Sequence, residues 1–568
     1  MKLTNIVAKT LKKNGINDAF GLQGGAVVHI FDSLEAEGFN VTYCHHEESA
    51  SLAAVANAKV TDSPGCVVVT SGPGCTNAIT GLLAAWQDSI PCIFLSGQVR
   101  SSHVSYGKKI RQLGTQEVPI LDIVKPIVKK TFLLDDKEKV IDIMHEAILE
   151  SLSGRPGPVW IDIPLDYQWD EAHIEQGDFK VLSLNKKPLA KQDEYEKFYY
   201  LMDEAISPLI VLGYGVRLSH SLDLCKSFIE KNSLDFVTTW TAADYFPTDH
   251  KNNLGIIGMR GQEGANKAIF ESDLVICLGT HLSIPHTTTL TETFAPNSKK
   301  IIINIDKDQL EELNIKFDLK IHEDLEIFLD KVSNELSHKD YKTLSYLKQL
   351  NWYHPYEEIR PNPNNFFRQL TKASKDRSAF IIDGGGTALY AGFQSAFIKE
   401  DQRIICSSSI SAMGTGLAET IGVHNSNNFT NLICIIGDGS FLMNIQDLQT
   451  IRSQNIPVII CVINNNGYLA IRNTQNEFLE GKLYGTHPDW SLEMPNIEKL
   501  SKGFEIPYYL LDNKLDIKKT VQKLIEETGP VICEVLVEED VKELFSQGYS
   551  SNDDGTFTPL PLYEMRKH

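Results

Sequence analysis

Short apolar runs alternate with amphipathic helical stretches along almost the whole chain, and this alternation constrains the fold more than any other feature. Most of the runs are apolar at consecutive positions, which is typical of strands that are buried on both faces of a parallel sheet. We therefore expect an α/β protein made of doubly wound parallel sheets. The clearest runs are residues 66–70, 93–96, 209–212, 274–278, 301–305, 379–382, 432–436 and 458–463.

Two polar stretches interrupt this alternation and divide the chain of 568 residues. The first covers about 176–196, and the second covers about 337–365 and ends in the proline-rich run RPNPNN. Segments of this kind usually link compact units. We expect three domains of ordinary size, at 1–170, 195–335 and 360–540, followed by a C-terminal tail at 541–568.

Composition argues against several classes of protein. The chain carries 74 acidic and 54 basic residues, a net charge of −20, so we expect no nucleic acid partner. Its apolar stretches are far shorter than a membrane span, and the N-terminus lacks a signal-peptide core, so we expect a cytoplasmic protein with no membrane partner. The ten cysteines include no C-x-x-C pair, which favours small buried side chains over a zinc site or a catalytic thiol.

The segment 431–468 carries the most informative motifs. An apolar strand runs into Gly437-Asp438-Gly439-Ser440, a helix follows, and a second apolar strand ends at Asn464-Asn465. In a strand–helix–strand unit the two strands are parallel, so both polar clusters lie at carboxyl ends, where open α/β sheets bind ligands.

These two clusters suit a magnesium ion bound to a diphosphate. Asp438 offers a carboxylate oxygen, Asn465 an amide oxygen, and a turn carbonyl near Gly467 a third oxygen. The flanking glycines let the backbone approach an anion closely, and the N-terminus of the helix after Ser440 favours negative charge. Either motif alone is more often a simple turn, but the two together predict a cofactor site.

The combination of G-D-G and N-N resembles the diphosphate-binding motif of thiamine diphosphate (ThDP) enzymes. The resemblance implies ThDP and Mg²⁺ as cofactors, with Asp438, Asn465 and Gly467 as metal ligands. In this family an apolar side chain also supports the two rings of the cofactor in a bent conformer, and Met413 takes that position. The implied cofactor-binding residues are Glu47, Gly386, Thr387, Ser411, Met413, Gly437, Asp438, Gly439, Ser440, Asn465 and Gly467.

Glu47 lies in the segment CHHEESASLAAVANAK, between an expected strand at 40–43 and an alanine-rich helix. ThDP chemistry requires removal of a weakly acidic proton by the cofactor's own aminopyrimidine, helped by a carboxylic acid at the far ring nitrogen. The segment is similar to the family motif H-E-[QE]-x-A, which assigns that role to Glu47. Without the family motif, the acidic pair at 47–48 is explained as two carboxylates at the start of a helix that interact favourably with the helix dipole.

Within the ThDP enzymes, the chain resembles the acetolactate synthase group over most of its length. The segments FGLQGGAV (20–27), 67–99 and SGRPGPVWIDIP (153–164) look like the N-terminal domain of that group, and Gln116 matches a catalytic-pocket glutamine. The resemblance implies decarboxylation of pyruvate and transfer of the two-carbon unit to a second carbonyl.

The sequence departs from the acetolactate synthase group at several positions that bear on which second carbonyl is accepted. Thr474 stands where biosynthetic enzymes have an acceptor-sensing tryptophan, Thr115 replaces a phenylalanine, and the segment 279–285 lacks two arginines that the group usually has. The segments 85–91, 111–117 and 464–475 look instead like synthase-like enzymes of surface-polysaccharide clusters, some of which use nucleotide-linked ketosugars. We prefer such a ketosugar as acceptor, with acetolactate formation from a second pyruvate as the alternative.

The middle of the chain resembles the flavin-binding domain of this group, through Gly213-Tyr214-Gly215, Gly258-Met259-Arg260-Gly261 and Asp306. The resemblance is compatible both with a domain that binds FAD in a structural role and with one that binds no flavin. Because Glu47 and Asp438 belong to different domains, the resemblance also implies a homodimer or homotetramer with its active site at the chain interface. A simple decarboxylase, an FAD-dependent oxidase and a scaffold without activity are the competing functions.

Overall fold

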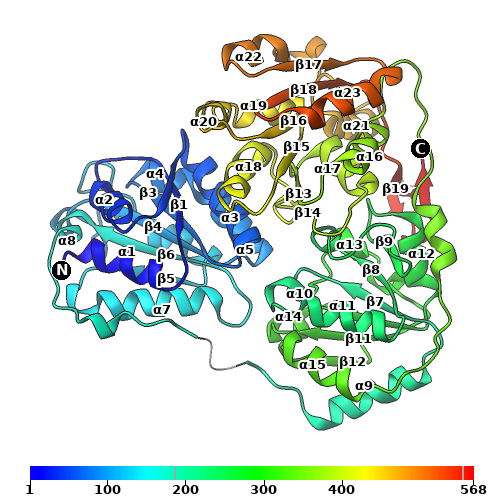
Figure 1. Ribbon diagram of the computed structural model, residues 1–568, viewed down its shortest axis with the longest axis horizontal. Coiled ribbons are helices and arrows are strands. Elements are labelled where there is room, and N and C mark those ends of the chain that lie inside the picture. Colours follow the sequence, from blue (N-terminus) through cyan, green and yellow to red (C-terminus); the bar gives the residue numbers. More distant parts are fainter. Residues whose placement is uncertain (184–186, 553–555) are drawn as a thin grey trace.

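The computed structural model describes residues 1–183, 187–552 and 556–568. Residues 184–186 of the expected linker and 553–555 of the expected tail therefore lie outside the described residues. The strands form three parallel six-stranded sheets and two small antiparallel pairs, and helices flank the three large sheets (Figure 1). This confirms the predicted α/β class with three parallel sheets. We call the sheets with their helices the N-terminal, central and C-terminal units.

The N-terminal unit has the strand order β2-β1-β3-β4-β6-β5. Alternate residues of β3 enter two different apolar clusters, so both faces of this sheet are buried. Its strands are β1 Asp18–Gly21, β2 Asn40–Tyr43, β3 Gly65–Val69, β4 Cys92–Gln98, β5 Lys130–Leu133 and β6 Pro158–Pro164. Its helices are α1 Leu3–Lys13, α2 Val28–Ala36, α3 Glu47–Thr61, α4 Pro73–Asn77, α5 Ile79–Asp88, α6 Ile120–Val124, α7 Val140–Leu152 and α8 Leu165–Gln168.

The central unit has the strand order β12-β11-β10-β7-β8-β9. Its strands are β7 Pro208–Leu212, β8 Asp235–Thr238, β9 Asn253–Ile256, β10 Leu274–Leu278, β11 Lys299–Asn304 and β12 Leu319–His322. Its helices are α9 Gln192–Glu204, α10 Gly215–Leu218, α11 Leu222–Lys231, α12 Glu263–Glu271, α13 Ile284–Thr287, α14 Lys307–Glu312 and α15 Leu325–Glu335. In both of these units consecutive apolar residues pair with neighbouring buried strands, as the sequence predicts.

The C-terminal unit has the strand order β14-β13-β15-β16-β18-β17. Its strands are β13 Ser378–Ile382, β14 Arg403–Ile405, β15 Asn431–Gly437, β16 Val458–Asn464, β17 Tyr508–Leu511 and β18 Val531–Leu536. Its helices are α16 Pro363–Ala373, α17 Gly386–Ser395, α18 Thr415–Asn425, α19 Asp438–Met443, α20 Asp447–Ser453, α21 Leu469–Phe478, α22 Ile497–Gly503 and α23 Ile517–Glu526.

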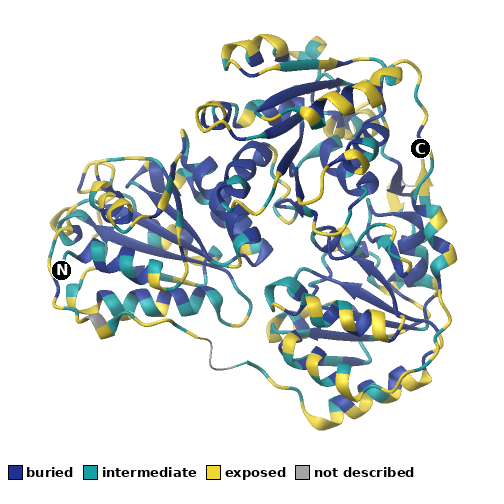
Figure 2. Ribbon diagram, viewed as in Figure 1, coloured by how far each residue is buried: buried dark blue, intermediate teal, exposed yellow. Residues whose placement is uncertain are grey.

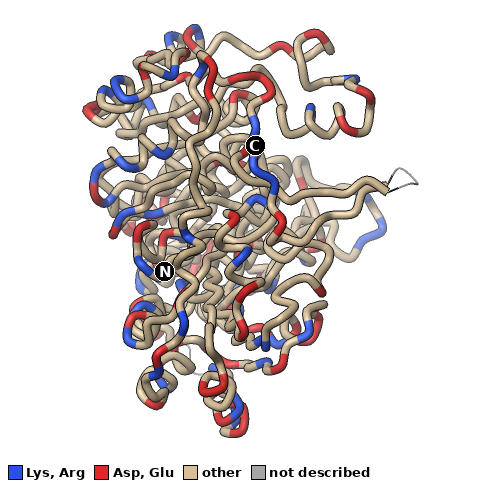
Figure 3. The backbone as a smooth tube through the Cα atoms, turned by 90° about the vertical axis from the view of Figure 1, so that its right-hand side faces the viewer, with Lys and Arg blue, Asp and Glu red and all other residues tan. Residues whose placement is uncertain are grey.

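Short elements complete the chain. In the tail, β19 (Phe545–Gln547) pairs with β22 (Met565–Lys567), and β20 (Tyr549–Ser551) pairs with β21 (Phe557–Pro559). The 3-10 helices are Ser101–His103, Lys125–Ile127, Lys137–Lys139, Gln176–Asp178, Trp240–Ala242, Thr291–Thr293, Ser345–Asn351, Pro488–Trp490 and Lys514–Asp516. Among the described residues, no helix combines the length and apolar character needed to cross a bilayer. Acidic and basic residues are interspersed in the view of Figure 3.

We expected one helix after Ser440, and this prediction is wrong. The structure has two helices, α19 and α20, with residues 444–446 between them. The Asn444 amide donates to the Gly414 carbonyl at 2.9 Å, and its oxygen accepts from the Gln446 amide at 3.0 Å. Asparagine side chains compete with helical hydrogen bonds in this way. The break ties this segment to the 411–414 loop.

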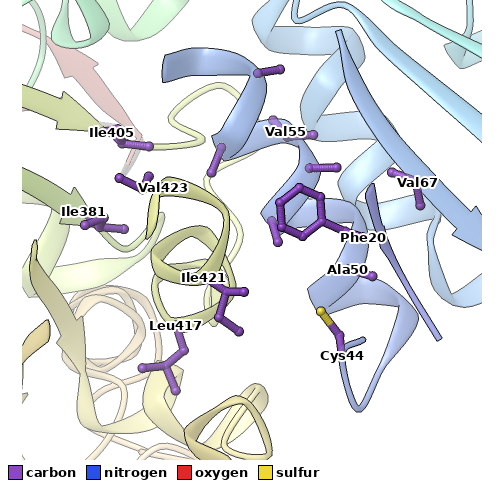
Figure 4. Packing of buried hydrophobic residues seen from close by; sticks show 14 of the residues in the cluster. Phe20, Cys44, Ala50, Val55, Val67, Ile381, Ile405, Leu417, Ile421 and Val423 are labelled. Atoms are coloured by element: carbon purple, nitrogen blue, oxygen red, sulfur yellow. The ribbon is translucent and has the colours of Figure 1, made fainter. Parts of the chain in front are cut away.

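The N-terminal and C-terminal units meet through α3 and α18, whose apolar side chains belong to one buried cluster (Figure 4). Both helices lie in the dark, buried band between these units in Figure 2. A Cβ atom built on Gly422 would lie 1.9 Å from the Ala53 carbonyl oxygen, so the two helices approach at a distance that only glycine permits. All ten cysteines are also buried, as expected.

We predict that Gly422→Ala forces α18 away from α3 and lowers stability by about 1–3 kcal/mol, the range for overpacked cores. Thermal unfolding would measure the change. Gly503→Ala is the matched control, because Gly503 also lies in a helix but a Cβ there meets no atom within 4 Å. We expect that control to stay within about 1 kcal/mol of wild type. Equal melting temperatures for Gly422→Ala and wild type would contradict the close helix contact.

Candidate active site

A cavity of about 1170 Å³ opens where the three units meet. The C-terminal unit contributes the carboxyl ends of β13, β15 and β16, the N-terminal unit contributes Trp86 and Arg155, and the central unit contributes Trp240, Arg260 and His286. The cavity brings together all ten cofactor-binding residues that the sequence predicts in the C-terminal unit. They are Gly386, Thr387, Ser411, Met413, Gly437, Asp438, Gly439, Ser440, Asn465 and Gly467.

Asp438 and Asn465 follow two strands that pair directly, since Gly437 of β15 lies opposite Ile463 of β16. The Asp438 carboxylate accepts hydrogen bonds from the Gly439 and Gly467 amides, at 2.9 and 2.8 Å. The carboxyl is 2% exposed, and this burial raises its pKa to about 6 despite those hydrogen bonds.

Asn465 is oriented by Thr387, whose hydroxyl accepts from the Asn465 amide nitrogen at 3.1 Å. This leaves the Asn465 side-chain oxygen buried without a partner. A buried oxygen without a partner is costly unless a ligand or cation completes it. The orphaned oxygen and the neighbouring carboxylate form a donor set of the kind that Mg²⁺ prefers, so the residues fit this ion.

The loop 411–414 packs on the turn after β13 without room for side chains. A Cβ on Gly385 would lie 2.5 Å from Met413 Cγ, and a Cβ on Gly384 would lie 2.4 Å from the Ala412 carbonyl oxygen. Ser411 has a φ of +49°, so the chain turns sharply just before Met413. Met413 lies directly against Gly385, and the contact leaves no space for a larger residue at position 385.

Asp383 links this loop to the turn. Its carboxylate accepts from the amides of Gly414 at 3.0 Å, Gly416 at 3.1 Å and Gly385 at 3.3 Å, and its burial raises its pKa to about 6. An aspartate directly before three glycines was the available signal, but its partners come from distant residues.

Glu47 and Gln116 do not line this cavity. Glu47 begins α3 in the N-terminal unit, where its carboxylate accepts from the Asn77 amide at 3.0 Å, and His46 caps the helix by accepting from the Glu48 amide. A Cβ on Gly74 would lie 3.4 Å from the Glu47 carboxylate, and one on Gly72 would lie 2.8 Å from the Gln116 carbonyl. The turn at 72–74 therefore lies beside both the buried Glu47 and the exposed Gln116, neither of which lines the cavity.

A second cavity of about 240 Å³ lies at the carboxyl ends of the central strands. It adjoins the large cavity, because Arg155, His281 and His286 line both. Burial lowers the pKa of both histidines, that of His286 to about 3, so both imidazoles are neutral at pH 7. The place agrees with the general rule for nucleotide sites on open sheets.

Arg155 joins the N-terminal and central units and was not among the predicted site residues. It donates to the Ser89 hydroxyl at 2.7 Å and to the Asp306 carboxylate at 3.2 Å. The arginine stands in the segment SGRPGPV, but nothing local shows that it reaches across to the end of β11.

Comparison with known proteins places the chain in one family. Residues 1–124 match the model "Thiamine pyrophosphate enzyme, N-terminal TPP binding domain", 196–332 match the central domain, and 384–535 match the C-terminal TPP binding domain. Thiamine pyrophosphate (TPP) is another name for ThDP.

Curated relatives agree with these matches over most of their length. The acetolactate synthase isozyme 2 large subunit of Escherichia coli is 28% identical over 96% of this chain and 98% of its own. The acetolactate synthase large subunits of Buchnera aphidicola (from Acyrthosiphon pisum) and Cyanidium caldarium are both 30% identical, over 88% and 95% of this chain and 88% and 94% of their own. The chain therefore belongs to the ThDP-dependent enzymes and is homologous to the large subunits of acetolactate synthases.

Proposed function

We propose that the protein is a Mg²⁺- and ThDP-dependent carboligase, which removes carbon dioxide from pyruvate and transfers the two-carbon unit to a carbonyl acceptor. The observation that supports this most directly is the pairing of a buried carboxylate, Asp438, with the orphaned oxygen of Asn465 at one edge of a large cavity. The size of the cavity leaves space beside a bound cofactor for substrates.

In this proposal Asp438, Asn465 and the Gly467 carbonyl hold the metal, while Gly386, Thr387 and the turn at 437–440 hold the diphosphate. Ser411 and Met413 hold the rings, because Met413 is fixed over Gly385. Bound ThDP would supply the nucleophilic carbon that makes decarboxylation of a 2-keto acid feasible. The chain's own residues position that group and exclude water from it.

Glu47 supplies the acid in this proposal, and Gln116 lies beside it to contact substrate. Both residues lie around the 72–74 turn and do not line the cavity of their own chain, and Glu47 is buried at 7% exposure. A second copy of the chain that places this turn over the cavity completes the site. We therefore propose a homodimer, alone or within a tetramer.

The acceptor is the least constrained part of the proposal. Thr474 does not line the cavity, and its hydroxyl donates to the Ala470 carbonyl of the same helix, while Ala470 and Ile471 do line it. The helix α21 contains no tryptophan. Arg155 and Arg260 line the cavity, each also paired with a carboxylate, Asp306 and Glu543 respectively, and these guanidinium groups are what favours an anionic acceptor such as a nucleotide-linked ketosugar. Acetolactate formation is the second candidate, favoured by the names of the relatives.

FAD stays a proposal for the adjoining cavity of the central unit, where it would have a structural role. In the wall shared by the two cavities, the neutral imidazoles of His281 and His286 suit an uncharged ring system, while Arg155 adds a cation beside them. The visible absorbance of the purified protein would show whether a flavin is bound.

We predict that Asp438→Asn weakens Mg²⁺-dependent ThDP binding by at least about tenfold, because it removes the anionic metal ligand. Calorimetric titration would measure this affinity. Asp447→Asn is the control, since Asp447 is equally buried on the next helix but does not line the cavity. Tight binding by the Asp438→Asn variant would remove Asp438 from the metal site.

We expect Glu47→Gln to abolish product formation while ThDP affinity stays close to that of wild type, because Glu47 does not contact the diphosphate half of the site. Glu48→Gln, at the next position, serves as the control and should retain activity. Turnover by the Glu47→Gln variant would exclude Glu47 from the mechanism.

Mixed dimers test whether two chains share a site. Glu47→Gln and Asp438→Asn proteins, each inactive, are dissociated and reassembled together in equal amounts. Half of the dimers are then mixed, and each has one intact site, so we expect about a quarter of wild-type activity. A mixture that stays inactive would show that Glu47 serves its own chain.

Labelled pyruvate, supplied alone and together with nucleotide-linked ketosugars, tests the acceptor. We expect mass spectrometry to show a branched sugar only when a ketosugar is present. Acetolactate as the sole product would overturn the preferred acceptor, and acetaldehyde alone would identify a simple decarboxylase.

A further inference from the structure

Lys59 is a buried cation near the end of α3, in a helix that is otherwise mostly alanine and apolar side chains. Its ammonium group donates to the Asp88 carboxylate at 2.9 Å, the Cys406 carbonyl at 2.8 Å and the Ser407 hydroxyl at 3.1 Å. Three N–H donors thus have three partners. Two of these partners lie in the C-terminal unit, directly after β14.

Two carboxylates complete this group. Asp88 ends α5 and also accepts from the Ser409 amide at 3.3 Å. Glu419 on α18 accepts from the Ser407 hydroxyl at 2.6 Å, and its other oxygen has no hydrogen-bond partner. We call Lys59, Asp88, Ser407 and Glu419 the buried cluster.

The charges in the buried cluster depend on one another. Burial alone would lower the pKa of Lys59, but Asp88 and Glu419 raise it above its ordinary value. Burial raises the pKa of Glu419 to about 7, and Lys59 opposes that rise. Loss of the cation would leave buried carboxyls without a counter-charge, which is strongly unfavourable.

The buried cluster holds one end of the segment 406–414, and Asp383 holds the other. Asp383 binds the Gly414 and Gly416 amides, whereas Lys59 and Asp88 bind positions 406, 407 and 409. Between these anchors, Ser408, Ser409, Ser411 and Met413 line the large cavity. The segment that lines the cofactor site is therefore anchored at both ends by buried charge.

We propose that Lys59, acting with Asp88 and Glu419, is a positioning residue that sets the place of the 406–414 segment, and with it Met413, in the active site of its own chain. The inference rests on the proposed function. It also gives α3 two tasks, because Glu47 at its start faces away from that site and Lys59 near its end supports it. The two residues are twelve positions apart, about 18 Å along a helix.

Mixed dimers with one working site distinguish positioning from a general loss of stability. One chain carries Glu47→Gln and supplies Asp438, and the other carries Asp438→Asn and supplies Glu47. Lys59→Met is then added to one chain or to the other. In the chain that supplies Asp438, Lys59 anchors the working 406–414 segment, and in the other chain it anchors the segment of the dead site.

We expect kcat to fall about tenfold or more when Lys59→Met lies in the chain that supplies Asp438, since a misplacement of 1 Å can cost about a hundredfold. We expect a change within about twofold when it lies in the other chain. Equal losses in both arrangements would mean a general structural role, and no loss in either would mean no role. Both results would overturn the proposal.

Ser407→Ala is the second variant, because it removes the hydroxyl that joins Lys59 to Glu419 while Lys59 and both carboxyls are kept. We expect the same asymmetry, with a smaller fall in kcat. Titration of Mg²⁺ and ThDP into the Ser407→Ala homodimer should also show weaker binding than wild type, and unchanged affinity would overturn the positioning role. If the parent mixed dimer lacks activity, the shared site is wrong, while this titration still tests the buried cluster.

Discussion

The parallel pairing of β15 with β16 is the interaction on which the candidate site depends. Gly437 lies opposite Ile463, so the chain leaves both strands at the same edge of the sheet, and the next residues are Asp438 and the 464–465 asparagines. Six backbone-paired positions of apolar residues hold this register. A shift of one residue would exchange the side chains that pack on the two buried faces and displace Asp438 relative to Asn465, so the register of the buried sheet also sets the geometry of the polar edge.

A second constraint comes from the contact of α3 with α18, which joins the N-terminal and C-terminal units of one chain. Gly422 permits the close approach, and the buried cluster and the Asn57 amide, which donates to the Gly422 carbonyl at 3.2 Å, connect the two helices by polar contacts. This packing directs Glu47 away from the cavity of its own chain. Glu47 does not line the cavity of its own chain, and in our proposal this is the physical reason for expecting a second chain.

Local chemistry explains which features could be predicted from sequence. The strand at 40–43 is found at its predicted residues, and the runs at 432–436 and 458–463 lie within β15 and β16, because consecutive apolar residues suit a sheet that is buried on both faces. The glycine-rich turns lie directly after those strands, where the chain leaves the sheet. The break at Asn444 escaped prediction, because the apolar spacing continues through it and only the distant Gly414 carbonyl shows why the helix stops. Thr474 lies away from the cavity, which the spacing of one short helix could not show.

The sequence by itself determined the α/β class, through apolar periodicity, and the metal-ligand candidates Asp438, Asn465 and Gly467, through turn chemistry within a few positions. The resemblance to ThDP enzymes supplied the other predicted residues that the cavity gathers from the C-terminal unit. Only the tertiary structure decided that Glu47 and Gln116 stand apart from that cavity, that Arg155 reaches Asp306, and that Lys59 supports the 406–414 segment. These relations join residues separated by tens to hundreds of positions. They follow from how whole units pack against one another, which no local pattern of residues encodes.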